Sequence, residues 1–336
     1  MKKEKEIIKQ NVGVDVSKDD VKVALSNLTT DYHVVVRSTR TFSNTNKGFQ
    51  ELQNWLKGKT EPTLPAHFTM EATGVYYEGL AYFFYERGYC LHVVLANYAK
   101  KYGQSLGIKS KTDKLDARTL AQMGLERELR VWQPVSPSLL GLKQLTRERD
   151  ALVCNRTAAA NQLHAYRHQG KPNKDSIART VKHISFLDRQ VKEIESEITK
   201  FVNRDKDLKT KMKYLLSIPG VGLLTAAVIV AETNGFAAIE SIKQLTSYAG
   251  LDVRIAESGT WKGKSKISKR GNSHIRKALF MPSLSRKTHD PTTNRFYERL
   301  KEKKGIGMIA TVAVERKLLG LMYSLWKKEE MYRHDC

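Results

Sequence analysis

Four acidic residues stand where a carboxylate could do chemistry. Asp15 lies between two valines in the apolar stretch VGVDV, and a buried carboxylate costs free energy unless it is paired or bound to a cation. Glu71 ends a second apolar stretch, TMEATG, where the edge of a sheet opens into a cleft. Asp113 and Asp116 are three residues apart in a helical pattern, so both side chains can point the same way.

Together these acids predict a site for Mg²⁺ or Mn²⁺, because such hard cations prefer carboxylate oxygens and leave room for substrate phosphate. Two such ions would hold the attacking and leaving oxygens of a phosphodiester displacement. Each acid taken alone also has a plainer interpretation. Asp113 could stabilise the helix dipole, Asp116 could pair with Lys114 or Arg118, and Glu71 could be a surface acid at a strand end. Spacing alone leaves both interpretations open.

The charge balance points to a polyanionic partner. Lys and Arg total 58 against 35 Asp and Glu, which gives a net charge of +23, and nucleic acid is the default partner for such a surplus. Residues 261–277 hold seven Lys or Arg and no acid, a density that fits phosphate contact. The candidate contacts to nucleic acid are Lys109, Lys111 and Lys114 beside the two helix acids, and Lys262, Lys264, Lys266, Lys269 and Arg270.

Other readings of the composition are weaker. No apolar run approaches the roughly 18–20 residues needed to span a bilayer, and the charged N-terminus lacks the apolar core of a signal peptide. We therefore expect no membrane partner and a cytoplasmic protein that is associated with the nucleoid when bound to DNA. Three cysteines are too few and too scattered for a disulfide framework or a zinc site.

The elements that must position the acids follow from apolar periodicity. Residues 11–132 alternate between strand-like and helix-like stretches, which is typical of a mixed α/β sheet. The expected order is three strands, a helix, a strand, a helix and a strand, at 11–16, 21–27, 32–37, 46–58, 66–72, 75–88 and 90–96. The helix that carries Asp113 and Asp116 follows after Thr112 as its cap.

From residue 137 to about 203 the pattern is helical only. Eight aliphatic residues recur at spacings of three and four, which forms a heptad-like stripe: Ile177, Val181, Ile184, Leu187, Val191, Ile194, Ile198 and Val202. A preceding leucine-rich helix is joined to this one by the polar turn HQGKPNK. The pattern is compatible with an antiparallel helical hairpin, a coiled-coil dimer, or two helices that pack within one monomer.

The last third reads as mainly helical. The segment IPGVG resembles the hairpin of a helix-hairpin-helix element, in which Gly220 and Gly222 would let backbone amides approach a phosphate. The alternative is a tight turn with no ligand. Ser258, in AESGT, has no neighbouring His or Asp that would form a recognisable triad, and on its residues alone it is a turn residue.

Several long motifs occur together in the order and spacing of one family. They are VGVDVSKDDVKVAL, MEATGVYYEGLAYFFYERGYCLHVV, KSKTDKLDARTLAQM, IPGVGLLTAAVIVAE and SYAGLDVRIAESGTWKGKSKISKRGNSHIRKAL. The chain resembles the DEDD-type insertion-sequence transposases that use a bridging non-coding RNA. That resemblance covers nearly the whole sequence.

The resemblance implies an RNase H-like, RuvC-like catalytic domain at 1–132, a helical coiled-coil linker at 133–209, a C-terminal transposase domain at 210–330 and a tail at 331–336. Within the matching motifs, Asp15, Glu71, Asp113 and Asp116 occupy the DEDD positions, and Ser258 occupies that of a catalytic serine. This chain has Ser-Gly-Thr where the family usually has Ser-Gly-Gly.

The implied activity is RNA-guided DNA transposition or recombination by a homo-oligomer, a dimer or tetramer, that binds donor DNA, target DNA and the bridging RNA. Two other functions fit the residues. One is a Holliday-junction resolvase-like endonuclease that uses the carboxylates and water, and the other is a basic nucleic-acid-binding protein without catalysis.

Overall fold

The computed structural model describes residues 6–72, 74–107, 113–254, 257–258, 260–263 and 266–333. It has two compact units, 1–134 and 135–336, and each is described by itself. Among the described residues, no helix is long and apolar enough to cross a membrane.

The first unit is built on one five-stranded sheet with the order β3-β2-β1-β4-β5. The pairs β1/β2 and β2/β3 are antiparallel, whereas β1/β4 and β4/β5 are parallel. The predicted mixed sheet is therefore confirmed. The strands are β1 (Ile7–Val16), β2 (Asp20–Thr29), β3 (Val34–Ser43), β4 (Ala66–Glu71) and β5 (Cys90–Val94).

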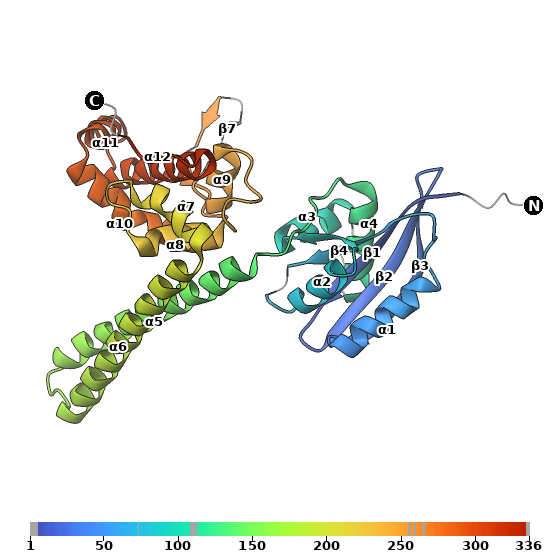
Figure 1. Cartoon of the computed structure of the whole chain (residues 1–336), viewed down its shortest axis with the longest axis horizontal. Coiled ribbons are helices and arrows are strands. Elements are labelled where there is room, and N and C mark those ends of the chain that lie inside the picture. Colours follow the sequence, from blue (N-terminus) through green and yellow to red (C-terminus); the bar gives the residue numbers. More distant parts are fainter. Residues whose placement is uncertain are drawn as a thin grey trace, which may run out of the picture. The chain divides into compact units, whose positions relative to one another are not determined.

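Helices cover both faces of this sheet (Figure 1). On one face, α1 and α2 bury an apolar stripe that includes Phe49, Leu52 and Phe84 against the valines of β1 and β2. On the other face, α4 packs over β1, β2 and β4, with Ala121 against Ala24 of β2, and α3 packs beside α4 in a cluster that includes Val94 of β5. The helices are α1 (Asn46–Lys57), α2 (Glu78–Tyr85), α3 (Ala96–Ser105) and α4 (Asp113–Glu126). Of these four helices, α3 has no counterpart among the elements predicted from the sequence.

The second unit begins with two long helices, α5 (Pro137–Arg167) and α6 (Lys174–Arg204). Arg149 on α5 pairs with Glu195 on α6 at 2.7 Å, and Arg156 pairs with Asp188 at 3.0 Å. Seven residues forward on α5 correspond to seven residues back on α6, so the two helices run antiparallel within one chain (Figure 1). Seven residues are two helical turns.

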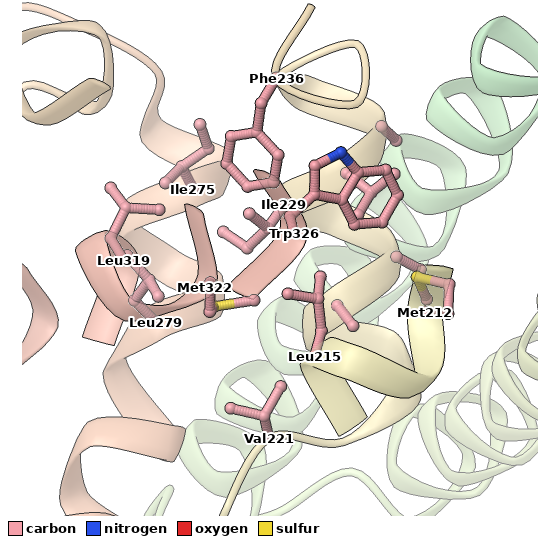
Figure 2. Packing of buried hydrophobic residues seen from close by; sticks show 14 of the residues in the cluster. Met212, Leu215, Val221, Ile229, Phe236, Ile275, Leu279, Leu319, Met322 and Trp326 are labelled. Atoms are coloured by element: carbon pink, nitrogen blue, oxygen red, sulfur yellow. The ribbon is translucent and has the colours of Figure 1, made fainter. Parts of the chain in front are cut away.

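The remaining helices pack against the end of this pair that contains the start of α5 and the end of α6. The core includes Ile194, Ile198 and Val202 from α6 together with Met212 and Leu215 from α7, so the segment expected as a linker and the segment expected as a C-terminal domain share one core. Figure 2 shows how residues of this core interlock. The helices are α7 (Lys206–Leu216), α8 (Leu223–Glu232), α9 (Ile242–Ala249), α10 (Ser273–His289), α11 (Pro291–Lys304) and α12 (Gly307–Lys328).

The predicted mainly helical character of the C-terminal region is confirmed, with one difference. Among the described residues between α9 and α10, around the basic run predicted from the sequence, the structure has four two-residue strands. They are β6 (Val253–Arg254), β7 (Glu257–Ser258), β8 (Trp261–Lys262) and β9 (Lys266–Ile267), and they pair as β6/β9 and β7/β8.

Candidate functional site

Two of the predicted site acids lie side by side at the carboxyl ends of neighbouring parallel strands. The register of β1 against β4 pairs Val14 with Met70, so Asp15 and Glu71 follow one residue later on each strand. Neighbouring strands are about 4.8 Å apart, and paired residues of parallel strands point to the same face. Both acids are half-buried. The sequence alone did not pair them, because 56 positions separate them along the chain.

Two glycines let α4 lie directly on this face of the sheet. A Cβ atom on Gly13 of β1 would lie 2.0 Å from the Ala117 carbonyl oxygen and 2.2 Å from the Ala121 amide nitrogen. A Cβ atom on Gly124 of α4 would lie 2.2 Å from the side chains of both Asn11 and Thr69. Contacts this close are possible only where both positions lack a side chain.

The same contacts fix the direction of α4. Gly124, late in the helix, lies over Asn11, early in β1, whereas Ala117 lies over Gly13. The helix therefore runs antiparallel to β1, and its first turn extends toward the end of β1 that carries Asp15. The helix begins at Asp113, and Asp116 is half-buried one turn inside it.

These positions converge at one end of the sheet, but their role as metal ligands stays a prediction. Lys109, Lys111 and Thr112 lie outside the described residues, as do the side chains of Asp113 and Lys114. In the part of the chain that the structure describes, Asp15, Glu71 and Asp116 do not form a trio with ligand oxygens all within 4.8 Å of one another. The chemistry of the donor set, carboxylate oxygen throughout, nevertheless fits Mg²⁺ or Mn²⁺.

A lysine that is not among the residues predicted from the sequence lies beside this site. Lys22 of β2 is directly opposite Asp15 in the antiparallel register, at the separation where opposite charges attract across strands. A small cavity of about 160 Å³ lies next to it and is lined by Lys22, Val23, Thr39, Arg40, Thr41 and Ala117. This lysine adds a positive charge beside the acids.

Ser258 is exposed and lies on β7, which pairs with β8 through Ser258 and Trp261. Of the basic residues predicted nearby, Lys266, Lys269 and Arg270 are exposed. Lys264 and the side chain of Lys262 lie outside the described residues. The base of this segment is fixed to the helical unit, because the Ser268 amide donates to the Asp252 carbonyl at 2.8 Å and the Lys269 amide donates to the Gly250 carbonyl at 3.0 Å.

The turn at residues 218–222 joins α7 to α8. Gly220 has φ +85°, a conformation that favours glycine, and Gly222 is the N-cap residue of α8 without a side-chain hydrogen bond to the helix. Ile218 and Val221 point into the core, while a Cβ atom on Gly222 would meet nothing within 4 Å. A Cβ atom on Gly220, in contrast, would lie 3.2 Å from the Ser285 hydroxyl of α10, so the turn is open at Gly222 and closely packed at Gly220.

A buried carboxylate in the second unit, Glu232 of α8, links the helices that lie next to the basic segment. Glu232 accepts hydrogen bonds from Arg147 at 2.7 and 3.0 Å and from the Asn272 amide at 2.7 Å. Burial alone would raise the pKa of Glu232, but these hydrogen bonds outweigh it and lower the pKa below its ordinary value. Asn272 also caps α10 through Ile275 and its neighbour, so one carboxylate ties together α5, α8 and the start of α10.

Comparisons with known proteins indicate the family to which the chain belongs. Residues 12–170 match the DEDD transposase model of the IS110 group, and residues 212–298 match the model of the transposase IS116/IS110/IS902 family. The chain is 29% identical to the pilin gene-inverting protein of Moraxella bovis, over 96% of this chain and 98% of that protein. It is 26% identical to the transposase for insertion sequence element IS1111A of Coxiella burnetii, over 67% and 69%.

The solved structures include a weaker match. It is the RuvC protein of T. thermophilus in complex with a Holliday junction substrate, with a TM-score of 0.27, 7% identity, and coverage of 37% of this chain and 99% of that one.

Two family models in succession define the class of the chain as that of DNA transposases and recombinases, which are enzymes. The chain belongs to the IS110/IS116 family of transposases. The resemblance read from the sequence is confirmed at this level. The bridging RNA, the metal site and the serine nucleophile stay predictions.

Proposed function

We propose that the chain is an RNA-guided DNA transposase or recombinase that cleaves and rejoins DNA at a composite site. Asp15, Glu71, Asp113 and Asp116 would hold Mg²⁺ or Mn²⁺, and Ser258 would be the nucleophile. The observation that carries the proposal is the direction of α4. Its packing through Gly13 and Gly124 supports the convergence of all four acids at one end of the sheet.

The first unit would supply the electrostatics of the reaction. A divalent cation bound there would polarise the scissile phosphate and stabilise the charge that develops on its oxygens. The chain's own residues orient the site: β1 and β4 carry Asp15 and Glu71, and the first turn of α4 carries the other two acids. Lys22 would attract the DNA backbone to this end of the sheet.

The serine would conserve the energy of the phosphodiester bond. When its Oγ attacks phosphorus, a serine–phosphate bond forms, the bond to one DNA oxygen breaks, the hydroxyl loses its proton and the leaving oxygen gains one. Attack by a second DNA hydroxyl reverses these steps and rejoins the strands. Because a serine hydroxyl is a weak nucleophile, it must be brought beside the polarised phosphate, which makes cutting dependent on docking of the two units.

The nucleic-acid contacts of the proposal are mostly phosphate contacts. Lys109, Lys111, Lys114, Lys262, Lys264, Lys266, Lys269 and Arg270 would contact the backbones of DNA or RNA, as would the amides at Gly220 and Gly222. Base pairing by a bridging non-coding RNA would select donor and target DNA, so that the protein needs to read little sequence itself. The net charge of +23 supports several polyanionic partners at once.

We also propose that the chain acts as a homo-oligomer, a dimer or tetramer. The contact would use the half of the α5/α6 pair that lies next to the turn joining the two helices. The C-terminal part of the apolar stripe on α6, which includes Ile194, Ile198 and Val202, is buried within the chain. That part therefore has no apolar face for a second copy to cover. Farther out, Val181 and Phe186 are 39% and 47% exposed. These two side chains lie about 140° apart around α6, so a single coiled-coil partner would cover one of them.

The test is a strand-exchange assay with the full chain, donor and target DNA, Mg²⁺ and RNA transcribed from the DNA that flanks the gene. Asp15→Asn, Glu71→Gln, Asp113→Asn and Asp116→Asn keep shape and remove charge, so each should lower recombination about 100-fold or more while RNA binding survives. Glu51→Gln, on the exposed side of α1, is the matched control and should recombine normally.

Ser258 is tested in the same reactions by denaturing electrophoresis. The unaltered chain should leave protein attached to cleaved DNA, and Ser258→Ala should abolish that adduct without loss of DNA or RNA binding. Ser247→Ala, at an exposed serine of α9, should change nothing. Cleavage without an adduct would identify a water-using endonuclease instead, and binding without cleavage would identify a non-catalytic protein. Full activity without RNA would exclude the guide.

A further inference from the structure

A second group of possible metal ligands lies on the α4 face of the sheet, at the opposite end from the acids. His67 of β4 is paired with Cys90 of β5, and His92 lies two residues beyond Cys90 on the same strand. Residues two apart on a strand share a face, so these side chains point to the same side. Their ligand atoms all lie within 4.8 Å of one another.

This group is separate from the carboxylates. His67 precedes Glu71 by four residues on β4, which corresponds to about 13 Å at the usual rise of a strand. A cation held by His67, Cys90 and His92 would therefore not share ligands with one held at the carboxyl ends of β1 and β4. Its ligand chemistry also differs, with two imidazoles and a thiol in place of oxygen.

The distances suit one small cation. Nδ1 of His67 lies 3.1 Å from Nε2 of His92, and Sγ of Cys90 lies 3.8 Å from the same nitrogen. In a tetrahedral zinc site, with Zn–N bonds of about 2.05 Å and a Zn–S bond of about 2.3 Å, two nitrogens are about 3.3 Å apart and nitrogen and sulfur are about 3.6 Å apart. Both observed separations are within a few tenths of an ångström of these values.

The ring of His92 is already oriented as a ligand. It is buried, at 6% exposure, and its Nδ1 lies 3.0 Å from the carbonyl oxygen of Arg130. A proton on Nδ1 that is donated to this carbonyl leaves the lone pair of Nε2 directed at the cluster, which is the second contact that metal-bound histidines usually make.

We propose that His67, Cys90 and His92 form a site for Zn²⁺ or a similar transition-metal cation, with the fourth position open. Thiolate and imidazole select such cations over Mg²⁺, and His67 and Cys90 are only half-buried, so a water molecule can complete a tetrahedron. The cation would join β4 to β5 and, through His92, to the segment after α4 that contains Arg130. The proposal does not depend on the function proposed above.

The experiment uses Co²⁺ as a spectroscopic probe on the full chain with Cys154→Ser and Cys336→Ser, so that Cys90 is the remaining thiol. Co²⁺ alone should produce one equivalent of a tetrahedral visible spectrum and a thiolate-to-cobalt charge-transfer band, and Zn²⁺ should displace both. Zn²⁺ should also raise the melting temperature. A cation at the carboxylates would give neither the intense visible bands nor the charge-transfer band.

The variants decide whether the three residues act together. Adding Cys90→Ser should abolish the charge-transfer band, and His67→Asn or His92→Asn should weaken Co²⁺ binding at least tenfold. Asp15→Asn, at the other end of the sheet, should leave the spectrum unchanged. His67→Asn covers the case in which the buried His92 cannot be replaced without unfolding, which circular dichroism detects. A chain that gives no charge-transfer band with excess Co²⁺, or a band that both histidine variants retain, would overturn the proposal.

Discussion

The two faces of the N-terminal sheet carry different kinds of side chains. Val12, Val14, Phe68 and Met70 point toward α1 and α2 and are completely buried. The alternate residues on the same two strands face α4 and are mostly polar: Asn11, Asp15, His67, Thr69 and Glu71. Because side chains alternate along a strand, one pair of strands supplies an apolar core on one side and every candidate ligand of β1 and β4 on the other.

The polar face of the sheet, which packs against α4, contains buried groups that lower the stability of the unit. Side-chain atoms of Asn11, Ser26 and Thr69 are buried and have no hydrogen-bond partner in the described part of the chain. A buried polar group without a partner costs about 1–3 kcal/mol. The apolar face should therefore provide most of the stability, while the α4 face positions reactive groups. Three substitutions test this contrast.

The largest expected effect is on the apolar face. Met70→Ala removes a fully buried side chain one residue before Glu71 and should lower the free energy of unfolding by about 2–5 kcal/mol. Denaturant titration measures it. Cobalt binding at His67, Cys90 and His92 should be unchanged below the unfolding transition. Val35→Ala, at a side chain that is 45% exposed, is the control and should stay within about 0.5 kcal/mol of the parent.

A smaller loss of stability, with a larger loss of function, is expected where the α4 face is closest packed. Gly13→Ala places a methyl group within 2.0–2.2 Å of backbone atoms of α4, so the helix must shift. Such overpacking costs about 1–3 kcal/mol. Moving α4 displaces Asp113 and Asp116 from Asp15, and recombination should fall as far as in Asp15→Asn.

The control for that substitution is also a glycine. Gly58 ends α1 with φ −90°, and a Cβ atom there would meet nothing within 4 Å. Gly58→Ala should therefore keep both stability and recombination. If Gly13→Ala recombines DNA as well as Gly58→Ala does, the position of α4 on β1 does not set the geometry of the acids.

The sequence predicted elements whose apolar periodicity is strong. Apolar periodicity indicated a helix at 46–58 and strands at 11–16 and 21–27. The structure confirms these elements as α1, β1 and β2 and extends the strands. The sequence pattern did not predict α3, because that helix buries only Ala99 and Tyr102 and follows β5 without a polar turn. A stripe of two residues is too short to show a period.

The candidate sites also depend on contacts between distant residues, which local sequence patterns do not show. The interruption of an apolar strand marked Asp15 in the sequence, but the register that places Glu71 beside it depends on strand pairing. Counting cysteines argued against a zinc site, whereas two of the three candidate ligands are histidines. His92 lies two residues from Cys90 on β5, and parallel pairing brings His67 to Cys90 from 23 residues away. Glu232 ends an apolar helix in the sequence, and nothing local shows that Arg147 reaches it.

The smallest expected effect tests the cost of the polar face directly. Thr69 is completely buried, and its hydroxyl has no partner among the described residues. Thr69→Val has nearly the same shape and removes that hydroxyl, so stability should stay equal or rise by about 1 kcal/mol. Thr233→Val is the control, because the Thr233 hydroxyl donates to the Ile229 carbonyl at 2.7 Å and accepts from the Phe236 amide at 3.2 Å.

Thr233→Val should therefore lower the free energy of unfolding by about 1–3 kcal/mol, since it leaves a buried amide without its acceptor. Opposite signs for the two threonines in thermal or denaturant unfolding would establish that the α4 face carries an unpaired hydroxyl beneath Gly124. A loss at Thr69 as large as that at Thr233 would mean that the hydroxyl is bonded, for example to a buried water. In that case the polar face is stabilising in its own right, and the two faces differ in chemistry but not in their contribution to stability.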